Sequence, residues 1–265
     1  MKSYSPYKFI LAAALVSSLS LAFLAPSMVK AAESDIEKEQ LDVVIVLAAD
    51  VSSSVGFFDY RTQKLGIIKA LRDPEVASLL VKCNSRGVGL TYIEWAGLPY
   101  FNQQKQVVAW SKLTQPEDLQ TFASKISASR RSFWSLGALT DINGALTFSM
   151  NLLLQAPFSS DRKIISLSSD GYHNTPDNTT DPTLKNKAQW AADLSATRER
   201  ILSQGVAINA ITISDIRREG PFIYDHWNLE VIGGPGAFVI PITNFDEFGD
   251  ALRAKLLREL NNCTS

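Results

Sequence analysis

The stretch LDVVIVLAADVSSS, residues 41–54, decides how the rest of the chain is interpreted. Its apolar and β-branched run, Leu41 to Ala49, is long enough for a strand buried on both faces, as in the middle of an α/β sheet. An acid and three hydroxyl residues follow this run. Because α/β folds bind ligands at the carboxyl ends of their parallel strands, Asp50, Ser52 and Ser54 would offer three hard oxygen donors to a magnesium-type ion.

The same DVSSS motif has a second interpretation. Asp and Ser are preferred helix N-caps, and a helical pattern follows over residues 57–71. This stretch alone does not decide between helix capping and metal binding. The decision depends on whether further oxygen ligands occur downstream.

The N-terminus has the pattern of a secretory signal peptide over residues 1–31. Lys2 and Lys8 precede an apolar core, Phe9–Leu24, and residues 29–31 (VKA) provide a site for cleavage after position 31. An uncleaved membrane anchor is the competing interpretation, because signal peptides and anchors overlap at this length of apolar run. Either way we expect the folded part to be exported, periplasmic or secreted, and no later apolar run approaches the length of a membrane span.

The composition is that of an ordinary globular protein. The chain has 265 residues, of which 46% are hydrophobic, and its formal net charge is −1. We expect a polar, flexible tether at residues 32–40 and one domain at residues 41–262. The near-neutral charge gives no reason to expect a nucleic-acid partner.

Strands and helices alternate along the expected domain. Strands are predicted at residues 87–95 and 106–110, which would pair as an antiparallel hairpin with a longer loop. The alternation predicts a three-layer α/β/α domain, doubly wound and Rossmann-like, with a mostly parallel sheet and one antiparallel edge strand. The other predicted strands cover residues 41–49, 163–168, 206–213 and 237–240, and the predicted helices cover residues 57–71, 76–81, 114–129, 141–154, 184–203, 221–231 and 244–260.

The chain contains two cysteines, Cys83 and Cys263. Cys83 follows the first predicted helical region, and Cys263 lies just past the last helix. If both helices run from the ligand face to the opposite face, these two ends are close together, and an exported protein can join them by a disulfide. Two free thiols are the alternative.

Two further oxygen-bearing residues follow at the ends of predicted elements. Thr140 stands at the start of the predicted helix at residues 141–154, and Asp170 follows the strand at residues 163–168. Because loops after central strands of a doubly wound sheet converge on one edge, these residues would meet the DVSSS motif. Oxygen-only ligands favour Mg²⁺ or Mn²⁺ over zinc, and Ca²⁺ if the site is roomy.

This set of residues resembles the metal-ion-dependent adhesion site of the von Willebrand factor type A (VWA) domain. The family motif is an Asp-x-Ser-x-Ser run, then a Thr, then an Asp, and this chain has all five ligand types in that order. One departure is that residues 138–139 (AL) replace the Gly-Gly pair that often precedes the threonine. The resemblance implies that Ser52, Ser54 and Thr140 hold the ion, with Asp50 and Asp170 bound directly or through water.

Three other segments resemble an exported bacterial group of these domains, the domain of unknown function 1194 (DUF1194) family. These segments are residues 73–76 (DPEV), 91–97 (TYIEWAG) and 231–239 (VIGGPGAFV). The likeness runs from about residue 41 to residue 260. It implies a fold and a metal site, but no established activity.

The resemblance also implies a binding protein rather than an enzyme. A partner protein, which the sequence does not identify, would complete the ion's coordination with an Asp or Glu, and Tyr172 and His173 are the candidate partner-binding residues beside the ion. A metal-dependent hydrolase is one alternative, because metals with open positions activate water and His173 lies three residues after Asp170. A structural domain in which the ion only stiffens the loops is the other.

Overall fold

The structure, a computed structural model, describes residues 38–98, 101–132, 138–174, 187–214 and 222–263. The expected signal peptide and most of the expected tether lie outside these residues. Within the described part of the chain, no helix is both long and apolar enough to cross a membrane.

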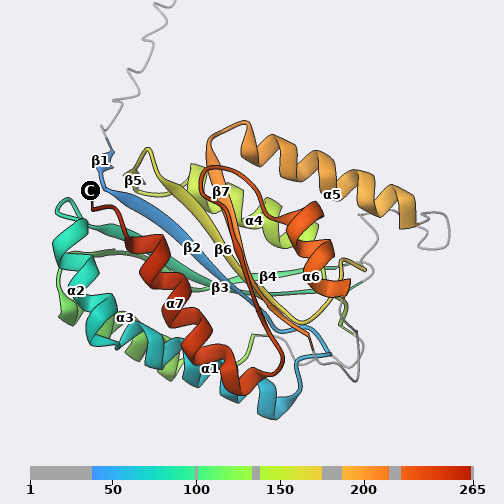
Figure 1. Cartoon of the computed structure of the whole chain (residues 1–265), viewed down its shortest axis with the longest axis horizontal. Helices are drawn as coiled ribbons and strands as arrows, with labels where there is room; N and C mark the ends of the chain where they lie inside the picture. The colour runs from blue at the N-terminus through green and yellow to red at the C-terminus, as the bar shows by residue number, and fades with distance from the viewer. Residues whose placement is uncertain (1–37, 99–100, 133–137, 175–186, 215–221, 264–265) are drawn as a thin grey trace, which may run out of the picture. The chain divides into compact units, whose positions relative to one another are not determined.

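A six-stranded sheet forms the middle layer of the domain (Figure 1). Its strands are β2 (Val43–Asp50), β3 (Val88–Leu98), β4 (Phe101–Leu113), β6 (Lys163–Ser169), β7 (Val206–Ile213) and β8 (Val239–Ile242). Their order in space is β4-β3-β2-β6-β7-β8. Every neighbouring pair is parallel except β3 and β4. The predicted mostly parallel sheet with one antiparallel edge strand is therefore confirmed.

Helices cover both faces of this sheet, so the predicted three layers are confirmed (Figure 1). One face carries α1 (Phe57–Leu71), α2 (Pro74–Cys83), α3 (Pro116–Ala128) and α7 (Phe248–Leu260). The other carries α4 (Ile142–Leu154), α5 (Lys187–Leu202) and α6 (Phe222–His226). A π-helical turn, Trp227–Val231, continues α6, and a 3-10 turn, Phe245–Glu247, precedes α7.

The hairpin of β3 and β4 is longer than the sequence predicted. β3 continues to Leu98 and β4 begins at Phe101, so the expected longer loop is replaced by strand. The polar residues of β4 concealed this extension. Gln104 donates from Nε2 to the Ala96 carbonyl at 3.3 Å, and Gln106 donates to Thr91 Oγ1 at 2.8 Å. These side chains are satisfied within the hairpin, so the strand needs no apolar alternation there.

The end of the expected tether also differs from its prediction. Residues 39–40 form strand β1 (Glu39–Gln40), which pairs in parallel with β5 (Phe158–Ser159). Lys112 Nζ forms an ion pair with Glu39 Oε1 at 2.5 Å. The chain is thus joined to the body of the domain two residues before the expected boundary.

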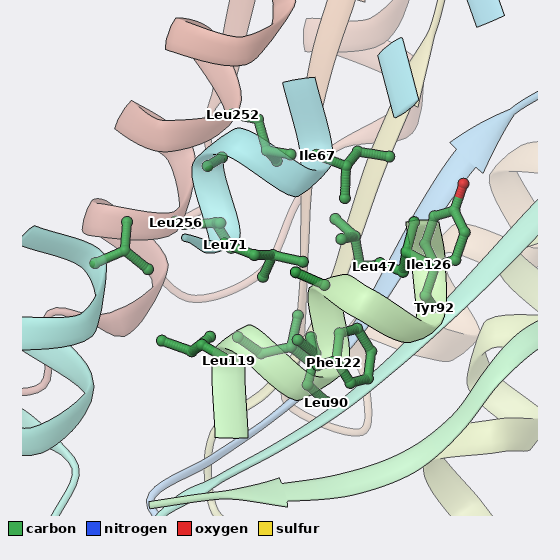
Figure 2. Close-up of a cluster of buried hydrophobic side chains, with 14 of the residues drawn as sticks. Leu47, Ile67, Leu71, Leu90, Tyr92, Leu119, Phe122, Ile126, Leu252 and Leu256 are labelled. Atoms are coloured by element: carbon green, nitrogen blue, oxygen red, sulfur yellow. The ribbon is translucent and has the colours of Figure 1, made fainter. Parts of the chain in front are cut away.

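Strand β2 is buried on both faces, as its apolar run predicted. Val43, Ile45 and Leu47 enter the core beneath α1, α3 and α7, while the residues between them enter the core beneath α4 and α5. Figure 2 shows the first of these cores, where Leu47 and Tyr92 from the sheet meet the side chains of the covering helices. At about 25 cal/mol per Å², burial of this kind is the main stabilising term of the fold.

The buried face of α1 differs from the face that the helical pattern indicated. The helical pattern of residues 57–71 rests on four apolar positions, Phe58, Leu65, Ile68 and Leu71. The last two are buried as expected, but Phe58 is 77% exposed and Leu65 is 55% exposed. Ile67, which is not one of these positions, is buried. The reason is the close approach of α7: a Cβ atom added at Gly66 would lie 3.0 Å from the backbone of Gly249. This contact sets the rotation of the helix against its neighbour.

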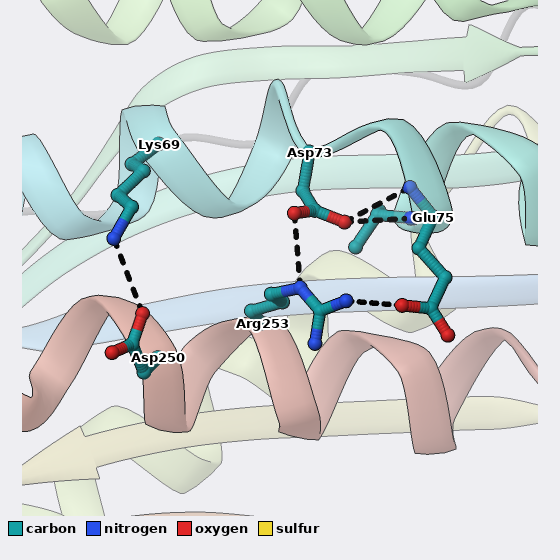
Figure 3. Close-up of polar contacts among 6 residues, drawn as sticks. Lys69, Asp73, Glu75, Asp250 and Arg253 are labelled. Carbon is teal, nitrogen blue, oxygen red and sulfur yellow. Dashed lines mark hydrogen bonds and ion pairs between the residues drawn. The ribbon is translucent and has the colours of Figure 1, made fainter.

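Helices α2 and α7 are also linked by polar contacts (Figure 3). Asp73 caps α2 by accepting the backbone N–H groups of Glu75 at 2.9 Å and Val76 at 3.3 Å. Its second oxygen accepts Nε of Arg253 at 2.9 Å, and Arg253 also pairs with Glu75. The Arg253 guanidinium and the backbone donors together lower the pKa of Asp73 despite the opposing effect of desolvation.

A fully buried ion pair joins α7 to the sheet. Lys255 Nζ lies 2.9 Å from Glu259 Oε1, and both side chains have no exposed surface. The Glu259 carboxylate also accepts Nδ2 of Asn209 at 2.9 Å and Oγ of Ser166 at 3.0 Å. Burial lowers the pKa of Lys255, an effect that the charge of Glu259 opposes.

Cys83 and Cys263 form a disulfide, with Cα atoms 4.6 Å apart, so the alternative of two free thiols is wrong. The bond joins the end of α2 to the segment after α7, as the helix directions predicted. It closes a loop over a sequence separation of 180 residues. Long loops have the most chain entropy to lose on cross-linking.

We expect the double variant Cys83→Ser/Cys263→Ser to lower the free energy of unfolding by about 2–5 kcal/mol. The cause is the larger conformational entropy of the unfolded chain. Urea unfolding of the oxidised protein, the reduced protein and the variant measures this. Equal midpoints for all three would contradict a stabilising bridge.

We expect Lys255→Met to lower the free energy of unfolding by about 3–5 kcal/mol, because it leaves a buried carboxylate without its counter-charge. Adding Glu259→Gln should restore part of the loss, since the amide is uncharged, its oxygen can accept from Asn209, and its NH2 group can donate to the Ser166 hydroxyl oxygen. Thermal and urea unfolding of the single and double variants measure the difference. A double variant less stable than the single one would contradict this account.

Candidate metal centre

The register of β2 and β6 brings the first two site segments together. Ala49 is aligned with Ser168 in this parallel pair, so Asp50 and Ser169, the next residues of the two strands, end at the same edge of the sheet. Asp170 follows immediately. The predicted convergence of the two carboxylates is thus a consequence of strand pairing alone.

Asp50 is 1% exposed and accepts hydrogen bonds on both oxygens. Its Oδ1 accepts the backbone N–H of Ser52 at 2.7 Å, and its Oδ2 accepts Oγ–H of Ser169 at 2.5 Å. Helix α1 begins later, with Gly56 as its N-cap and without a side-chain cap. The interpretation of DVSSS as a helix cap is therefore wrong.

The three predicted hydroxyls complete a connected cluster. Ser54 Oγ donates to Asp170 Oδ1 at 2.6 Å and lies 3.1 Å from Ser52 Oγ. Thr140 Oγ1 donates to Ser52 Oγ at 3.4 Å. All five predicted oxygen ligands therefore lie in one hydrogen-bonded group.

Thr140 is positioned by the loop that precedes α4. Leu139 and Gly97 exchange two backbone hydrogen bonds of 2.5 and 2.6 Å, which join this loop to the end of β3. Asn174 then holds Thr140 on both sides: its Oδ1 accepts the threonine N–H at 2.7 Å, and its backbone N–H donates to the threonine carbonyl at 3.1 Å. A Cβ atom at Gly171 would lie 2.7 Å from Thr140 Oγ1, so only glycine fits there.

An arginine and a buried glutamate support the DVSSS loop from beneath. Arg131 Nη2 donates to the carbonyls of Val51 at 2.8 Å, Val55 at 2.9 Å and Ser52 at 3.1 Å. The fully buried Glu94 accepts Tyr60 Oη–H at 2.9 Å, and the Arg131 guanidinium lies over the Tyr60 ring at 5.0 Å.

Sequence reasoning missed Ser169, Asn174, Arg131 and Glu94 as parts of the site. The serine directly before Asp170 carried the only local signal, a second hydroxyl in the SSDG segment. The other three act through contacts across 34 to 80 residues of sequence, for which no local pattern exists.

The electrostatics of the cluster fit a hard dication. Burial, and then the negative charge of Asp170, raise the pKa of Asp50 to about 7, against the opposing effect of its hydrogen bonds to Ser169 and Ser52. Two buried carboxylates side by side are unfavourable without a positive counter-charge. Carboxylate and hydroxyl oxygens suit Mg²⁺, Mn²⁺ or Ca²⁺. Within the described residues, no group of three or more His, Cys, Asp and Glu side chains forms a competing zinc-type site.

Tyr172 and His173 do not join this cluster. The hollow beside the cluster has a volume of about 470 Å³, and its described lining includes Ser54, Thr140 and Asn174 but no histidine. His173 lines a second hollow on the other side of Asn174. Burial, with the charge of the nearby His226, lowers the pKa of His173 to about 4.

Comparison with known proteins identifies the family. Residues 40–264 match the family described as "Protein of unknown function (DUF1194)", so the chain belongs to this family. The resemblance noted in the sequence is thereby confirmed. No curated protein matches the chain.

Solved structures similar to this chain share its VWA-like fold. Proximal thread matrix protein 1 from the mussel byssus is 17% identical, with a TM-score of 0.52 over 85% of this chain and 49% of its own. The PilB minor pilin from Streptococcus sanguinis (D319A mutant) is 14% identical, with a TM-score of 0.55 over 85% of this chain and 64% of its own. This chain thus spans less than two thirds of either protein. Another structure of the mussel protein, 16% identical with a TM-score of 0.52 over 85% of this chain and 48% of its own, is described as having a zinc-occupied MIDAS motif, the metal-ion-dependent adhesion site.

We expect Ser52→Ala to weaken Mn²⁺ binding by about tenfold or more, which corresponds to roughly 1.4 kcal/mol or more, because it removes one oxygen donor. Ser53→Ala is the matched control, since Ser53 Oγ donates to the Ala138 carbonyl at 2.8 Å outside the cluster. Isothermal titration and the metal-dependent rise in melting temperature measure both variants. Equal losses in the two variants would contradict the donor assignment.

Proposed function

We propose, from the membership of this chain in the DUF1194 family and its VWA-like fold, that it is an exported protein-binding domain. It binds a divalent cation, in first place Mg²⁺, through the cluster described above, and engages a carboxylate of a partner protein there. The five cation ligands are Asp50, Ser52, Ser54, Thr140 and Asp170.

The observation that carries this proposal is the connected oxygen cluster beside an open hollow. Asp50, Ser52, Thr140 and Asp170 are each less than 10% exposed, whereas Ser54 opens onto the hollow of about 470 Å³. Most of the proposed ligands are thus shielded from bulk water, while the cluster remains accessible through the hollow at Ser54. Such a site can receive a group from another molecule.

The residues of the chain hold and orient the site. Ser169 and the N–H of Ser52 fix the two oxygens of Asp50, and Asn174 fixes the position of Thr140. A bound dication supplies an electrophilic centre, only just neutralised by two carboxylates, to which an Asp or Glu of the partner can bind. Mn²⁺ and Ca²⁺ fit the same oxygen set, and the zinc-occupied MIDAS of the mussel protein supports a divalent ion.

The disulfide and the similar structures support an extracytoplasmic location. Disulfides persist in oxidising compartments, and Cys83 and Cys263 are bonded. One further similar structure is the pilus adhesin SpaC from Lactobacillus rhamnosus GG, 13% identical with a TM-score of 0.51 over 85% of this chain and 32% of its own. We accordingly assign residues 1–31 to a signal peptide and residues 41–262 to the VWA-like domain.

The geometry gives less support to a metal-dependent hydrolase. A hydrolytic site requires a general base within hydrogen-bond reach of the attacking water. His173 is the histidine closest in sequence to the proposed ligands, and it lines the neighbouring hollow instead.

We expect the mature protein to capture its partner from an exported protein fraction in Mg²⁺ and to lose it in chelator. Thr140→Ala should abolish capture and Ser53→Ala should retain it, because only the first removes a proposed ligand. Amidation of the carboxylates in the fraction with carbodiimide and ethanolamine should also abolish capture.

Two outcomes would contradict the proposal. Capture that survives both chelation and carboxylate amidation would show that binding does not use the ion. Magnesium-dependent turnover of phosphoesters or peptides that Asp170→Ala abolishes would favour the hydrolase. Circular dichroism of each variant separates these outcomes from loss of the fold.

A further inference from the structure

A second hollow of about 360 Å³ lies beside the ion-binding hollow. Its walls carry four aromatic rings, contributed by Tyr172 and His173 after β6, Trp190 on α5 and His226 at the end of α6. The two histidines of the chain, His173 and His226, therefore face one cavity. We call this cavity the aromatic hollow.

The π-helical turn after α6 builds one wall of the aromatic hollow. Trp227 Nε1, at the start of this turn, donates to the Gly171 carbonyl at 3.0 Å, one residue after Asp170. His226 Nδ1 lies 2.9 Å from Glu230 Oε2, and the His226 ring lies 5.2 Å from that of Tyr172. Single π-helical turns occur frequently at functional sites.

Two buried nitrogens of the aromatic hollow have no hydrogen-bond partner within the described part of the chain. These are Nε1 of Trp190 and Nε2 of His226. Buried polar atoms of native proteins are nearly always paired, so each exception requires an explanation. Both exceptions lie at one cavity, where a polar group of another molecule can pair with them.

The unpartnered atoms define the chemistry of that group. Trp190 Nε1 is a donor. With Nδ1–H of His226 directed to Glu230, its Nε2 is an acceptor. Glu230 is the only described charged residue of the lining, and it is already bound to His226. The hollow therefore suits an uncharged, flat group that both donates and accepts.

The aromatic hollow and the ion-binding hollow share Asn174 as a wall. The same Asn174 side chain holds Thr140 at 2.7 Å. A protein segment that binds at the ion is therefore directly beside the aromatic hollow.

We propose that the aromatic hollow binds a tyrosine side chain of the same partner protein that supplies the carboxylate. A phenol has a flat ring for the aromatic walls and a hydroxyl that donates and accepts, whereas phenylalanine lacks a polar atom and an indole only donates. Tyrosine is also among the side chains that contribute most to protein interfaces. The inference rests on the proposed function, and it adds a sequence requirement to it: an acid near a tyrosine.

The aromatic hollow is tested alone with 4-methylphenol, the side-chain analogue of tyrosine, by ligand-observed NMR on the mature protein. We expect weak binding that Ala191→Phe abolishes, because Ala191 lines the hollow. Ala192→Phe is the matched control, since Ala192 is an exposed neighbour on α5 outside the described lining. Thr140→Ala should still bind 4-methylphenol, because this step does not require the ion.

The connection to the ion site is tested with synthetic peptides that carry one Glu and one Tyr at spacings of one to four residues. In Mg²⁺, we expect at least one spacing to bind about tenfold more tightly than its Tyr→Ala counterpart. The Tyr→Phe peptide should lose most of this gain. Ala191→Phe should abolish the gain, and Ala192→Phe should preserve it.

The outcomes separate the two proposals. Binding of 4-methylphenol that Ala191→Phe does not change, or no binding to the folded protein, overturns the tyrosine site and leaves the ion proposal intact. If the peptides bind in a metal-dependent way but the tyrosine does not tighten their binding, the tyrosine site is overturned and the ion proposal stands. If no Glu peptide binds with metal while 4-methylphenol does, the proposed function fails, and the aromatic hollow is a small-molecule site rather than part of this interface.

Discussion

A buried pair of carboxylates at the end of the central strand is the constraint on which the rest of this structure depends. Asp50 ends the central strand, almost without exposed surface, and Asp170 directly follows the neighbouring strand β6. Desolvation by burial, and then the negative charge of Asp170, raise the pKa of Asp50 to about 7. A fold does not keep such a pair unless serine hydroxyls, backbone N–H groups or a cation stabilise it. The surrounding loops supply the serine hydroxyls and the backbone N–H groups.

The loops that carry the site are held from several directions at once. Arg131 binds three carbonyls of the DVSSS loop, the Leu139–Gly97 pairing anchors the loop before α4, and Asn174 holds Thr140. These contacts are made between groups of the protein, and they restrict the positions of the oxygens. Preorganisation of this kind reduces the ordering that binding requires. The residues that stabilise the loops therefore also hold the oxygens of the proposed site.

Much of the fold and the five proposed ligands could be predicted from sequence, because these features repeat local patterns. The apolar run of β2 and the motifs at Asp50, Thr140 and Asp170 depend on neighbours within a few residues. Other predictions were wrong where a distant neighbour decided the outcome. Phe58 and Leu65 are exposed because α7 approaches α1 at Gly66, and β4 is longer because the glutamines within it bond to β3.

The sequence by itself determined the strand buried on both faces, the alternation of strands and helices, and the order of the oxygen-bearing residues. These follow from side-chain chemistry and periodicity, which act over short distances along the chain. Only the tertiary structure decided that Ser54 bonds to Asp170 rather than caps α1. It also decided that Cys83 meets Cys263, and that both histidines face one hollow with Trp190. Each of these depends on strand register and helix packing, which bring together residues that no local pattern relates.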